Sequence, residues 1–413
     1  MQSIPALVQS FYPQLDALYK DIHTHPELAF QEVRTASRLA AEMRALGFEV
    51  TEKVGRTGLV AIFRNGSGPT VLVRTDLDAL PMEEKTGLPY ASRATATWQG
   101  KETFVAHSCG HDIHMASWVG TARTLLSLKD QWRGTLMFVA QPAEEAGGGA
   151  KAMLADGLYK RFPKPDFAFA LHTSPRAFGS VGYRAGASNS AADGFEITFK
   201  GRGGHGSAPH LTLDPITMAA HFINDVQTVV SREKDPSSFG VVSIGAVQAG
   251  TAGNIIPDSA LLRGTIRSYD PKTRDILIDG VRRTARASAE MAAAPEPTIS
   301  LDPARGTPAV VNDAKLVARI VPALKAQLGD DKVFEIPRVF ASEDFSEFAA
   351  EGVPIMFFYV GVYDPKDVAE AVKGGKPLPP NHSPFFAPVP EPSITTGVRA
   401  MTSAVLNALG AKD

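Results

Sequence analysis

Length, composition and charge define a globular protein and exclude several other classes. The 413 residues are more than one ordinary hydrophobic core accommodates, so we expect two domains. Hydrophobic residues make up 44% of the chain and charged residues 21%, which excludes a disordered protein. The formal net charge is −2 without any basic block, so nucleic acid and anionic membranes are not expected as partners.

The sequence also bears on location. No apolar run approaches the length of a transmembrane helix. Residues 1–19 lack the basic start and apolar segment of a signal peptide, so we expect a cytoplasmic protein. A signal removed earlier would leave the same appearance. Cys109 is the only cysteine, which excludes an internal disulfide and fits a reducing compartment.

The first part of the chain predicts helices followed by strands. Residues 7–19 and 32–46 have the apolar spacing of amphipathic helices. His23 and His25 lie between these helices, where they could bind a metal or pack and cap a turn. We favour the structural interpretation for this pair. Beyond them, two apolar, β-rich segments flank an Asn-Gly-Ser-Gly-Pro turn, at residues 58–63 and 70–74.

Acidic residues and a histidine follow three predicted strands at the point where each strand ends. In chain order these are Asp76 and Asp78 after 70–74, Glu144 and Glu145 after 134–141, and His172 after 167–171. Buried carboxylates at strand ends are costly unless they serve a site, although a turn cap would explain one aspartate of the first pair. Sites in open α/β sheets form at the carboxyl edge of the strands. We therefore expect these side chains to share one rim.

The segment 107–114 concentrates side chains that bind metals, with three histidines, a cysteine and an aspartate. A thiolate beside imidazoles suits zinc, cobalt, nickel or manganese-like ions. Gly110 allows a tight turn, so that Cys109 and His111 could face one ion. Residues 115–128 predict a helix, whose N-terminal N–H groups would favour a thiolate. A buried cysteine near surface histidines is the alternative, which this density of ligands disfavours.

The pattern changes at about residue 186. The order strand, helix, strand, strand, helix, strand is that of a ferredoxin-like domain, with these elements at 195–200, 214–232, 240–248, 259–269, 271–293 and 298–301. The Gly-rich segment 201–210 lacks the Lys-Ser/Thr of a P-loop and the spacing of a dinucleotide fingerprint, which excludes both nucleotide sites. The chain then returns to the earlier pattern, with helices at 313–328 and 392–409, a short helix opening at 341–345 and a buried strand at 353–360.

We therefore predict an α/β fold with a helix-flanked, mostly parallel sheet. Residues 1–185 and 300–413 would form this domain, and residues 186–299 an inserted α+β domain.

Together, these motifs resemble the dinuclear metallo-amidohydrolases and metallopeptidases. That family includes hippurate hydrolase, indole-3-acetyl-amino-acid hydrolases, aminoacylases and N-acetyldiaminopimelate deacetylase. The resemblance spans nearly the whole chain and rests on the joint order of its motifs, which are 76–81, 109–114, 141–145, His172, 203–206, 254–257, 342–345 and 381–384. It implies a zinc-exopeptidase-like catalytic domain and an inserted lid and dimerisation domain. A homodimer or higher homo-oligomer is therefore expected.

The resemblance also implies a role for individual residues. Two divalent ions per subunit, which could be Zn, Mn, Co or Ni, would be bound by Cys109 as the bridge, His111, Glu145, His172 and His382. Glu144 matches the general base. His205 matches a residue that polarises the scissile carbonyl, in its own or a neighbouring subunit, and Asn254 and Arg267 match positions that hold the substrate carboxylate.

Two aspartates would support the ligands. Asp78 matches a position that orients a histidine ligand. Asp76 stands where broader relatives place that histidine, a departure shared with the hippurate-hydrolase-like branch, in which His111 compensates.

The activity implied by the resemblance is metal-dependent hydrolysis of a linear amide bond. The substrate would be a small N-acyl or N-aroyl amino acid, cleaved to a carboxylic acid and an amino acid by activated water. A dipeptidase or carboxypeptidase using the same site is one alternative. A non-catalytic binding protein that kept the fold is another, although such a protein has no use for Glu144. The sequence leaves the acyl group, the amino acid and its chirality open.

Overall fold

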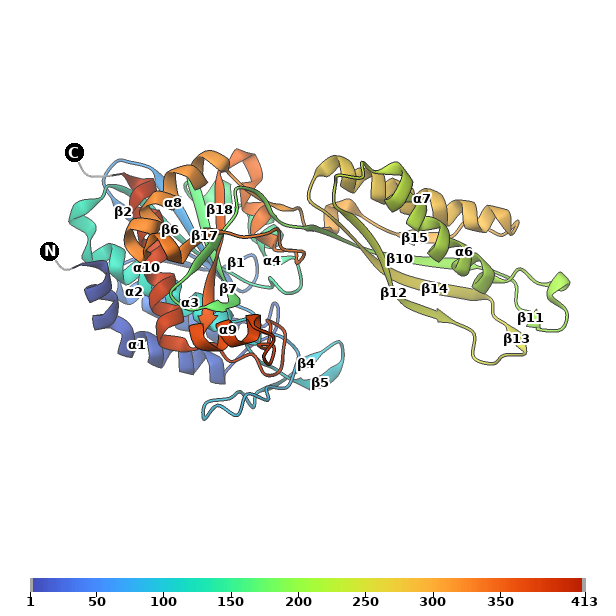
Figure 1. The fold of residues 1–413 in the computed structure, drawn as a ribbon, viewed down its shortest axis with the longest axis horizontal. Coiled ribbons are helices and arrows are strands. Elements are labelled where there is room, and N and C mark those ends of the chain that lie inside the picture. Colours follow the sequence, from blue (N-terminus) through green and yellow to red (C-terminus); the bar gives the residue numbers. More distant parts are fainter. Residues whose placement is uncertain (1–2, 411–413) are drawn as a thin grey trace. The chain divides into compact units, whose positions relative to one another are not determined.

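The computed structural model describes residues 3–410 and divides the chain into two compact units (Figure 1). The first unit comprises residues up to Gly186, Val311–Pro337 and the chain from Asp344 onward. The second unit comprises Ala187–Val310 and Arg338–Glu343. Residues 1–2 and 411–413, which the predicted catalytic domain includes, lie outside the described residues. The catalytic and lid roles of the two domains stay predictions.

An eight-stranded sheet forms the centre of the first unit, in the order β1-β2-β6-β3-β7-β18-β8-β17. Its strands are β1 (Glu49–Val54), β2 (Gly58–Asn65), β3 (Thr70–Asp76), β6 (Gly134–Gln141), β7 (Phe167–Ala177), β8 (Val181–Tyr183), β17 (Val333–Glu335) and β18 (Ile355–Tyr363). The central strands β6, β3, β7 and β18 are parallel neighbours. Every residue of β3 and of β18 is buried, as expected of parallel strands covered on both faces. The predicted fold class is confirmed.

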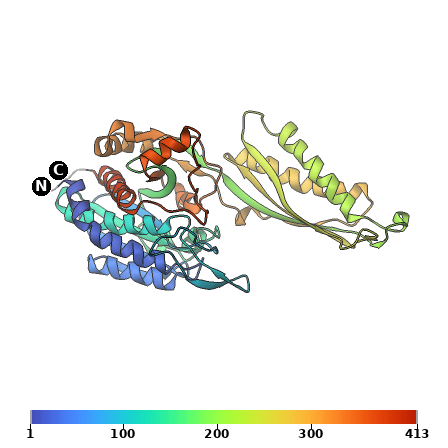
Figure 2. The same cartoon turned by 60° about the horizontal axis from the view of Figure 1, so that its bottom comes forward.

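Helices cover both faces of this sheet. They are α1 (Ile4–Thr24), α2 (Val33–Ala45), α3 (His111–Ser127), α4 (Gly149–Ala155), α5 (Leu158–Arg161), α8 (Ala314–Leu328), α9 (Pro365–Val372), α10 (Pro390–Leu409) and the 3₁₀ segments η1 (Lys129–Gln131), η5 (Asp330–Lys332) and η6 (Asp344–Gly352). Helices α1, α3 and α10 pack side by side (Figure 2). Their buried side chains meet alternate residues of the strands, such as Val73 and Phe138. On the other face, Phe345 of η6 packs against Phe357 of β18.

Several boundaries differ from the sequence prediction. Helix α3 begins at His111 and not at residue 115, so His111 and His114 lie in its first turn and not in the loop before it. Helix α1 continues to Thr24, because the next helix-breaking residue is Pro26. Strand β7 does not end at His172, because its pairing with β18 continues as far as Ala177. The short helix predicted to open at 341–345 begins at Asp344 and is a 3₁₀ segment.

The second unit has a four-stranded antiparallel sheet in the order β12-β14-β10-β15. Its elements are β10 (Ala191–Lys200), β11 (Gly204–His205), η2 (Pro209–Leu211), α6 (Pro215–Thr228), η3 (Val229–Glu233), β12 (Gly240–Ala249), β13 (Ile255–Ile256), β14 (Ser259–Ser268), α7 (Pro271–Met291), β15 (Thr298–Ser300) and η4 (Pro303–Arg305). Helices α6 and α7 pack on the sheet around Phe222 and Leu262. The remaining short strands of the chain are β4 (Thr95–Trp98), β5 (Lys101–Phe104), β9 (Gly186–Asn189) and β16 (Val310–Asn312).

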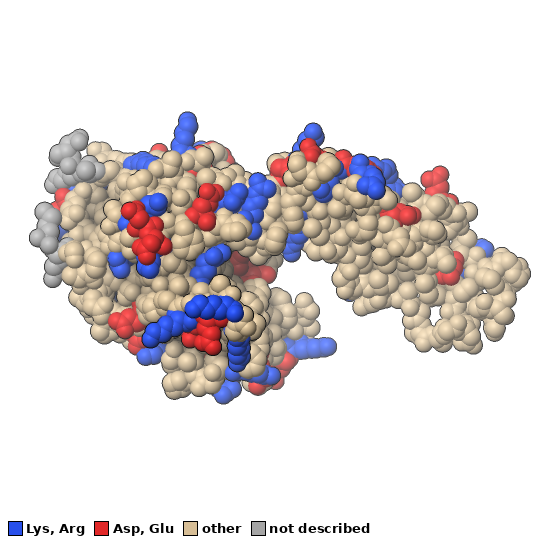
Figure 3. All heavy atoms as spheres, in the orientation of Figure 1, with Lys and Arg blue, Asp and Glu red and all other residues tan. Residues whose placement is uncertain are grey.

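The surface of each unit carries charges of both signs. On the face that Figure 3 shows, Lys and Arg side chains are interspersed with Asp and Glu on each unit. Within residues 3–410, no helix is both long and apolar enough to cross a membrane.

His23 ties the end of α1 to the start of α3. It is buried, with Nδ1 at 2.6 Å from Asp112 Oδ2 and Nε2 at 3.1 Å from Glu84 Oε2. Burial lowers the pKa of His23, but the two carboxylates outweigh this effect and raise the pKa to about 10. His25 is exposed and its Nδ1 lies 2.8 Å from the Asp21 carbonyl oxygen. The structural interpretation of these two histidines is therefore confirmed.

The H23Q variant should lose a stabilisation that depends on pH. The folded-state pKa of His23 lies above its ordinary value of 6.5, so the ion pairs stabilise the fold fully below about pH 6.5. This stabilisation is lost as the pH rises towards 10. Urea unfolding with a chelator present should show the largest difference between wild type and H23Q near pH 6, shrinking towards pH 10. A difference independent of pH would contradict a charged His23, and H25A serves as the control.

Candidate metal centre

Cys109 and His111 are placed by a tight turn at the start of α3. Gly110 has φ of 85°, and a Cβ there would lie 2.7 Å from Thr173 Oγ1, so glycine is required. The Cys109 carbonyl oxygen accepts hydrogen bonds from Thr173 Oγ1 at 2.8 Å and from Asn381 Nδ2 at 2.9 Å. The turn is thereby fixed to β7 and to the loop that carries His382.

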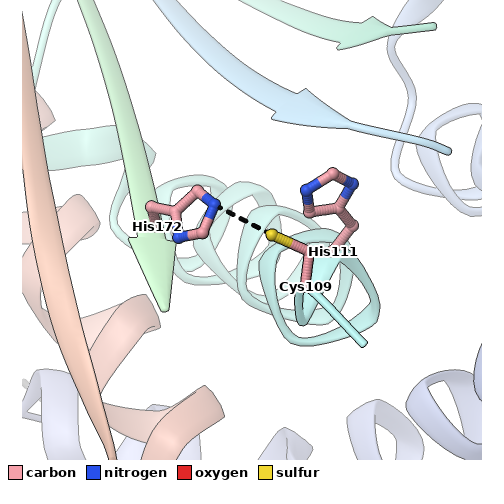
Figure 4. Close-up of side chains that lie close together, drawn as sticks. All are labelled: Cys109, His111 and His172. Atoms are coloured by element: carbon pink, nitrogen blue, oxygen red, sulfur yellow. Dashed lines mark hydrogen bonds between the residues drawn. The ribbon is translucent and has the colours of Figure 1, made fainter. Parts of the chain in front are cut away.

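The five predicted ligands come from four segments and converge with Glu144. Cys109 Sγ lies 3.4 Å from His172 Nε2 (Figure 4). His382 Nε2 lies 3.3 Å from Glu145 Oε1. His111 Nε2 lies 3.8 Å from Glu145 Oε1 and 3.9 Å from Glu144 Oε2.

The ligand atoms fall into overlapping groups. One group is Cys109, His111 and His172, a second is Cys109, Glu145 and His382, and a third is His111, Glu144 and Glu145; within each, the ligand atoms lie within 4.8 Å of one another. Cys109 belongs to the first two groups. His111 and Glu145 also belong to two of these groups each, but the single lone pair of His111 Nε2 binds only one ion. Cys109 and Glu145 therefore have the position that a bridging ligand requires.

His111 and His172 have the hydrogen-bond pattern of metal ligands. His111 Nδ1 donates to the Asp78 carbonyl oxygen at 2.7 Å, and His172 Nδ1 donates to the Thr173 carbonyl oxygen at 2.7 Å. Each Nε2 lone pair is thereby left available, as in histidines that bind metals. His111 Nε2 is buried and has no hydrogen-bond partner. A buried ring nitrogen that has no partner and lies beside carboxylates and a thiol fits a cation, which would replace a proton there.

The electrostatics of the cluster also favour a cation. Burial lowers the pKa of His111, but Asp76, Asp78 and Glu145 outweigh it and raise the pKa to about 10. Burial, together with Glu145 and Glu144, raises the pKa of the Cys109 thiol well above its ordinary value. The carboxylates therefore favour positive charge at this place, and a divalent ion would supply it. His172 is different, because burial and His114 lower its pKa to about 3, which keeps it neutral and able to bind metal.

Asp78 holds the loop that carries the two glutamates. Its Oδ1 and Oδ2 accept from the backbone N–H of Glu144 and Glu145, each at 3.0 Å. Since its carbonyl oxygen accepts from His111, one residue orients three candidate site residues. Its side chain is buried, and this burial raises the pKa of Asp78.

Asp76 is engaged with other side chains. Its Oδ2 accepts from Arg74 at 2.8 Å and its Oδ1 lies 2.7 Å from His114 Nδ1. His114 Nε2 accepts from the backbone N–H of Thr173 at 2.8 Å. Both nitrogens of His114 are thus occupied, and it supports the site instead of binding an ion.

Sequence reasoning assigned no role to His114 or Asn381. The signal for His114 was its spacing, because residues three apart on a helix lie on one face. Asn381 precedes His382, whose φ of 66° is unusual for a residue other than glycine and whose N–H donates to the Ser108 carbonyl oxygen at 2.8 Å. The two loops that supply Cys109 and His382 are therefore bonded directly.

The remaining predicted site residues lie in the second unit. His205 is in β11, exposed, and its Nδ1 lies 2.7 Å from Ser207 Oγ. The Asn254 carbonyl oxygen accepts from Gly206 N at 2.8 Å, so His205 and Asn254 are close neighbours. Arg267 lies near the far end of β14, roughly 27 Å along the strand from Ser259, so the structure does not bring it to His205 and Asn254. The catalytic and substrate-binding roles of these residues stay predictions.

Comparisons with known proteins identify the family of this chain. The family model described as "Peptidase family M20/M25/M40" matches residues 72–407. Hippurate hydrolase of Campylobacter jejuni is 36% identical over 351 residues, which cover 84% of this chain and 88% of the relative. N-acetylcysteine deacetylase of Bacillus subtilis is 37% identical over 284 residues, which cover 68% and 72%. The crystal structure of a Bacillus subtilis protein described as a dinuclear metal binding peptidase superposes with a TM-score of 0.77 at 29% identity, covering 96% and 97%.

The fold and these comparisons define a metal-binding hydrolase. The chain belongs to the peptidase family M20/M25/M40. The predicted resemblance and the predicted enzyme class are confirmed.

Removing single ligands should lower metal content. H172A and H382A each delete one member of a different ligand group, so each should bind less metal than wild type after equal loading and dialysis. Elemental analysis of the folded variants checks this. H25A deletes an exposed histidine outside these groups and should keep wild-type content. Undiminished content in both H172A and H382A would contradict the site.

Proposed function

We propose that this chain hydrolyses the amide bond of N-acyl or N-aroyl amino acids. Cys109, His111, Glu145, His172 and His382 would hold two divalent ions, with Cys109 between them. The observation that carries the proposal is the sharing of Cys109 by two ligand groups beside Glu144. Relatives named hippurate hydrolase and N-acetylcysteine deacetylase support this substrate class.

The chemistry divides between the bound ions and the protein. When bound, two divalent ions supply Lewis-acid activation of water and of the substrate carbonyl. Glu144 would take the proton from water and deliver it to the leaving amine. Its position suits this role, because Asp78 fixes its backbone while Glu145, the next residue, faces His382. The mixed thiolate, imidazole and carboxylate set accommodates Zn, Mn, Co or Ni.

The second unit would contribute to substrate recognition. His205 would stabilise the oxyanion that develops on the carbonyl, from its own or a neighbouring subunit. Asn254 and Arg267 would hold the substrate carboxylate, for which a guanidinium is well suited. Since the two residues lie far apart within one chain, one of them would come from a neighbouring subunit. This unit would serve as lid and dimerisation domain in a homodimer or higher homo-oligomer.

E144Q should abolish turnover and leave the metal content normal. The amide cannot take a proton, so kcat should fall by about 10²–10⁴-fold while the ligands remain intact. Steady-state kinetics and elemental analysis of the same sample check this. A near-wild-type rate in E144Q would show that another group is the base.

A substrate panel should separate the proposal from its alternatives. Hippurate and N-acetyl amino acids should release amine, and a chelator should stop this release. Cleavage of dipeptides with no cleavage of acyl amino acids would instead indicate a dipeptidase or carboxypeptidase. Binding without turnover after loading with each metal would indicate a non-catalytic protein.

A further inference from the structure

Glu32 is a buried carboxylate that none of the roles above uses. It directly precedes α2 and is fully buried, with a relative exposure of 0%. Its Oε1 accepts from the backbone N–H of Ala143 at 2.8 Å and of Phe30 at 2.9 Å, and its Oε2 accepts from the Thr57 hydroxyl. Burial raises the pKa of Glu32 to about 7, and Asp78 adds to this effect. A carboxyl group in this place is therefore costly.

Capping of its own helix does not explain this carboxylate. The Glu32 side chain accepts no hydrogen bond from the first turn of α2. Glu27 does so instead, because its carboxylate accepts from Arg34 N at 3.1 Å and from Thr35 N at 2.7 Å. The Glu32 carboxylate reaches Ala143, which is 111 positions away in the sequence.

Ala143 is the point where the loop after β6 turns. Its φ of 49° is in the left-handed region, which costs free energy for a residue with a Cβ and persists only where neighbours enforce it. The Ala143 carbonyl oxygen accepts from Gly148 N at 3.3 Å and from Gly149 N at 3.2 Å. At Gly149 a Cβ would lie 1.5 Å from the Pro142 carbonyl oxygen, so the loop is closed tightly on itself.

Three consecutive backbone N–H groups of this loop are held by two buried carboxylates. Glu32 accepts from Ala143, and Asp78 accepts from Glu144 and Glu145. The direction in which the glutamate side chains leave the backbone depends on the torsion angles at these residues. Glu32 therefore holds the first of the three N–H groups, that of Ala143, and so helps to set the direction of the Glu144 side chain.

We propose that Glu32 is a positioning residue for hydrolysis, which enforces the strained turn at Ala143 and so aims Glu144. This inference rests on the proposed function, because it takes Glu144 as the base.

The test compares E32A and E32Q with E27A as a matched control. E32A removes the acceptor of the Ala143 N–H, so kcat should fall about 10- to 100-fold, as expected when a reacting group is misplaced, while KM changes less than about twofold. E32Q keeps an oxygen for Ala143 and Phe30 and offers an N–H to Thr57, so it should restore most of kcat. E27A removes the carboxylate that accepts from two N–H groups of α2, the helix that Glu32 precedes. It should therefore lower the melting temperature and leave kcat within about twofold.

All variants are assayed after saturation with metal, with the metal content of each sample measured. If E32A does not fold, E32D replaces it, since it keeps the charge but shortens the reach by one methylene and should lose kcat where E32Q retains it. A folded E32A or E32D with kcat within about twofold of wild type would overturn the inference, as would an equal loss of kcat in E27A. E144Q, assayed in parallel, separates the two claims. An inactive E144Q beside a normal E32A refutes only the role of Glu32, whereas an active E144Q refutes the base itself.

Discussion

The site depends on one buried aspartate at the carboxyl end of the central strand. Asp78 accepts the backbone N–H groups of Glu144 and Glu145 with its carboxylate and the imidazole N–H of His111 with its carbonyl oxygen. Each of these donors would cost about 1–3 kcal/mol if it were left buried without a partner. Asp78 thus couples the loop after β6 to the start of α3, and the candidate base to the candidate ligands.

Sheet topology explains why residues far apart in the sequence meet at Asp78. Strands β6, β3 and β7 are parallel neighbours, so the segments after β6 and β3 emerge at the same edge. His172 projects from β7, and β18 continues beside that strand on its other side. Helix α3 starts with His111 at this edge, and the Cys109 turn before it is bonded to Thr173 and Asn381. The acidic surroundings that raise the pKa of His111 are the surroundings that a divalent cation would neutralise.

Hydrophobic patterning predicted the parallel sheet, because its strands are continuous apolar runs. Strand β6, for example, was predicted with the bounds that the structure shows. The strand-end rule predicted the rim of Asp78, Glu144 and Glu145. Local patterning failed where pairing with distant residues determines the end of a strand. Strand β7 continues past Pro175 because β18 pairs with it. It also gave no sign of Glu32, which was predicted as the first residue of the helix 32–46, since a glutamate at the start of a helix is ordinary. Only the fold shows that its carboxylate reaches the Ala143 N–H.

The central claim is that Cys109 lies between two bound cations, one with His111 and His172 and the other with Glu145 and His382. Crystals of the metal-loaded protein, measured at the absorption edge of the loaded metal, test this most directly. The account predicts two anomalous peaks in each subunit, both within bonding distance of Cys109 Sγ. A single peak, or two peaks of which neither contacts Cys109, would contradict it.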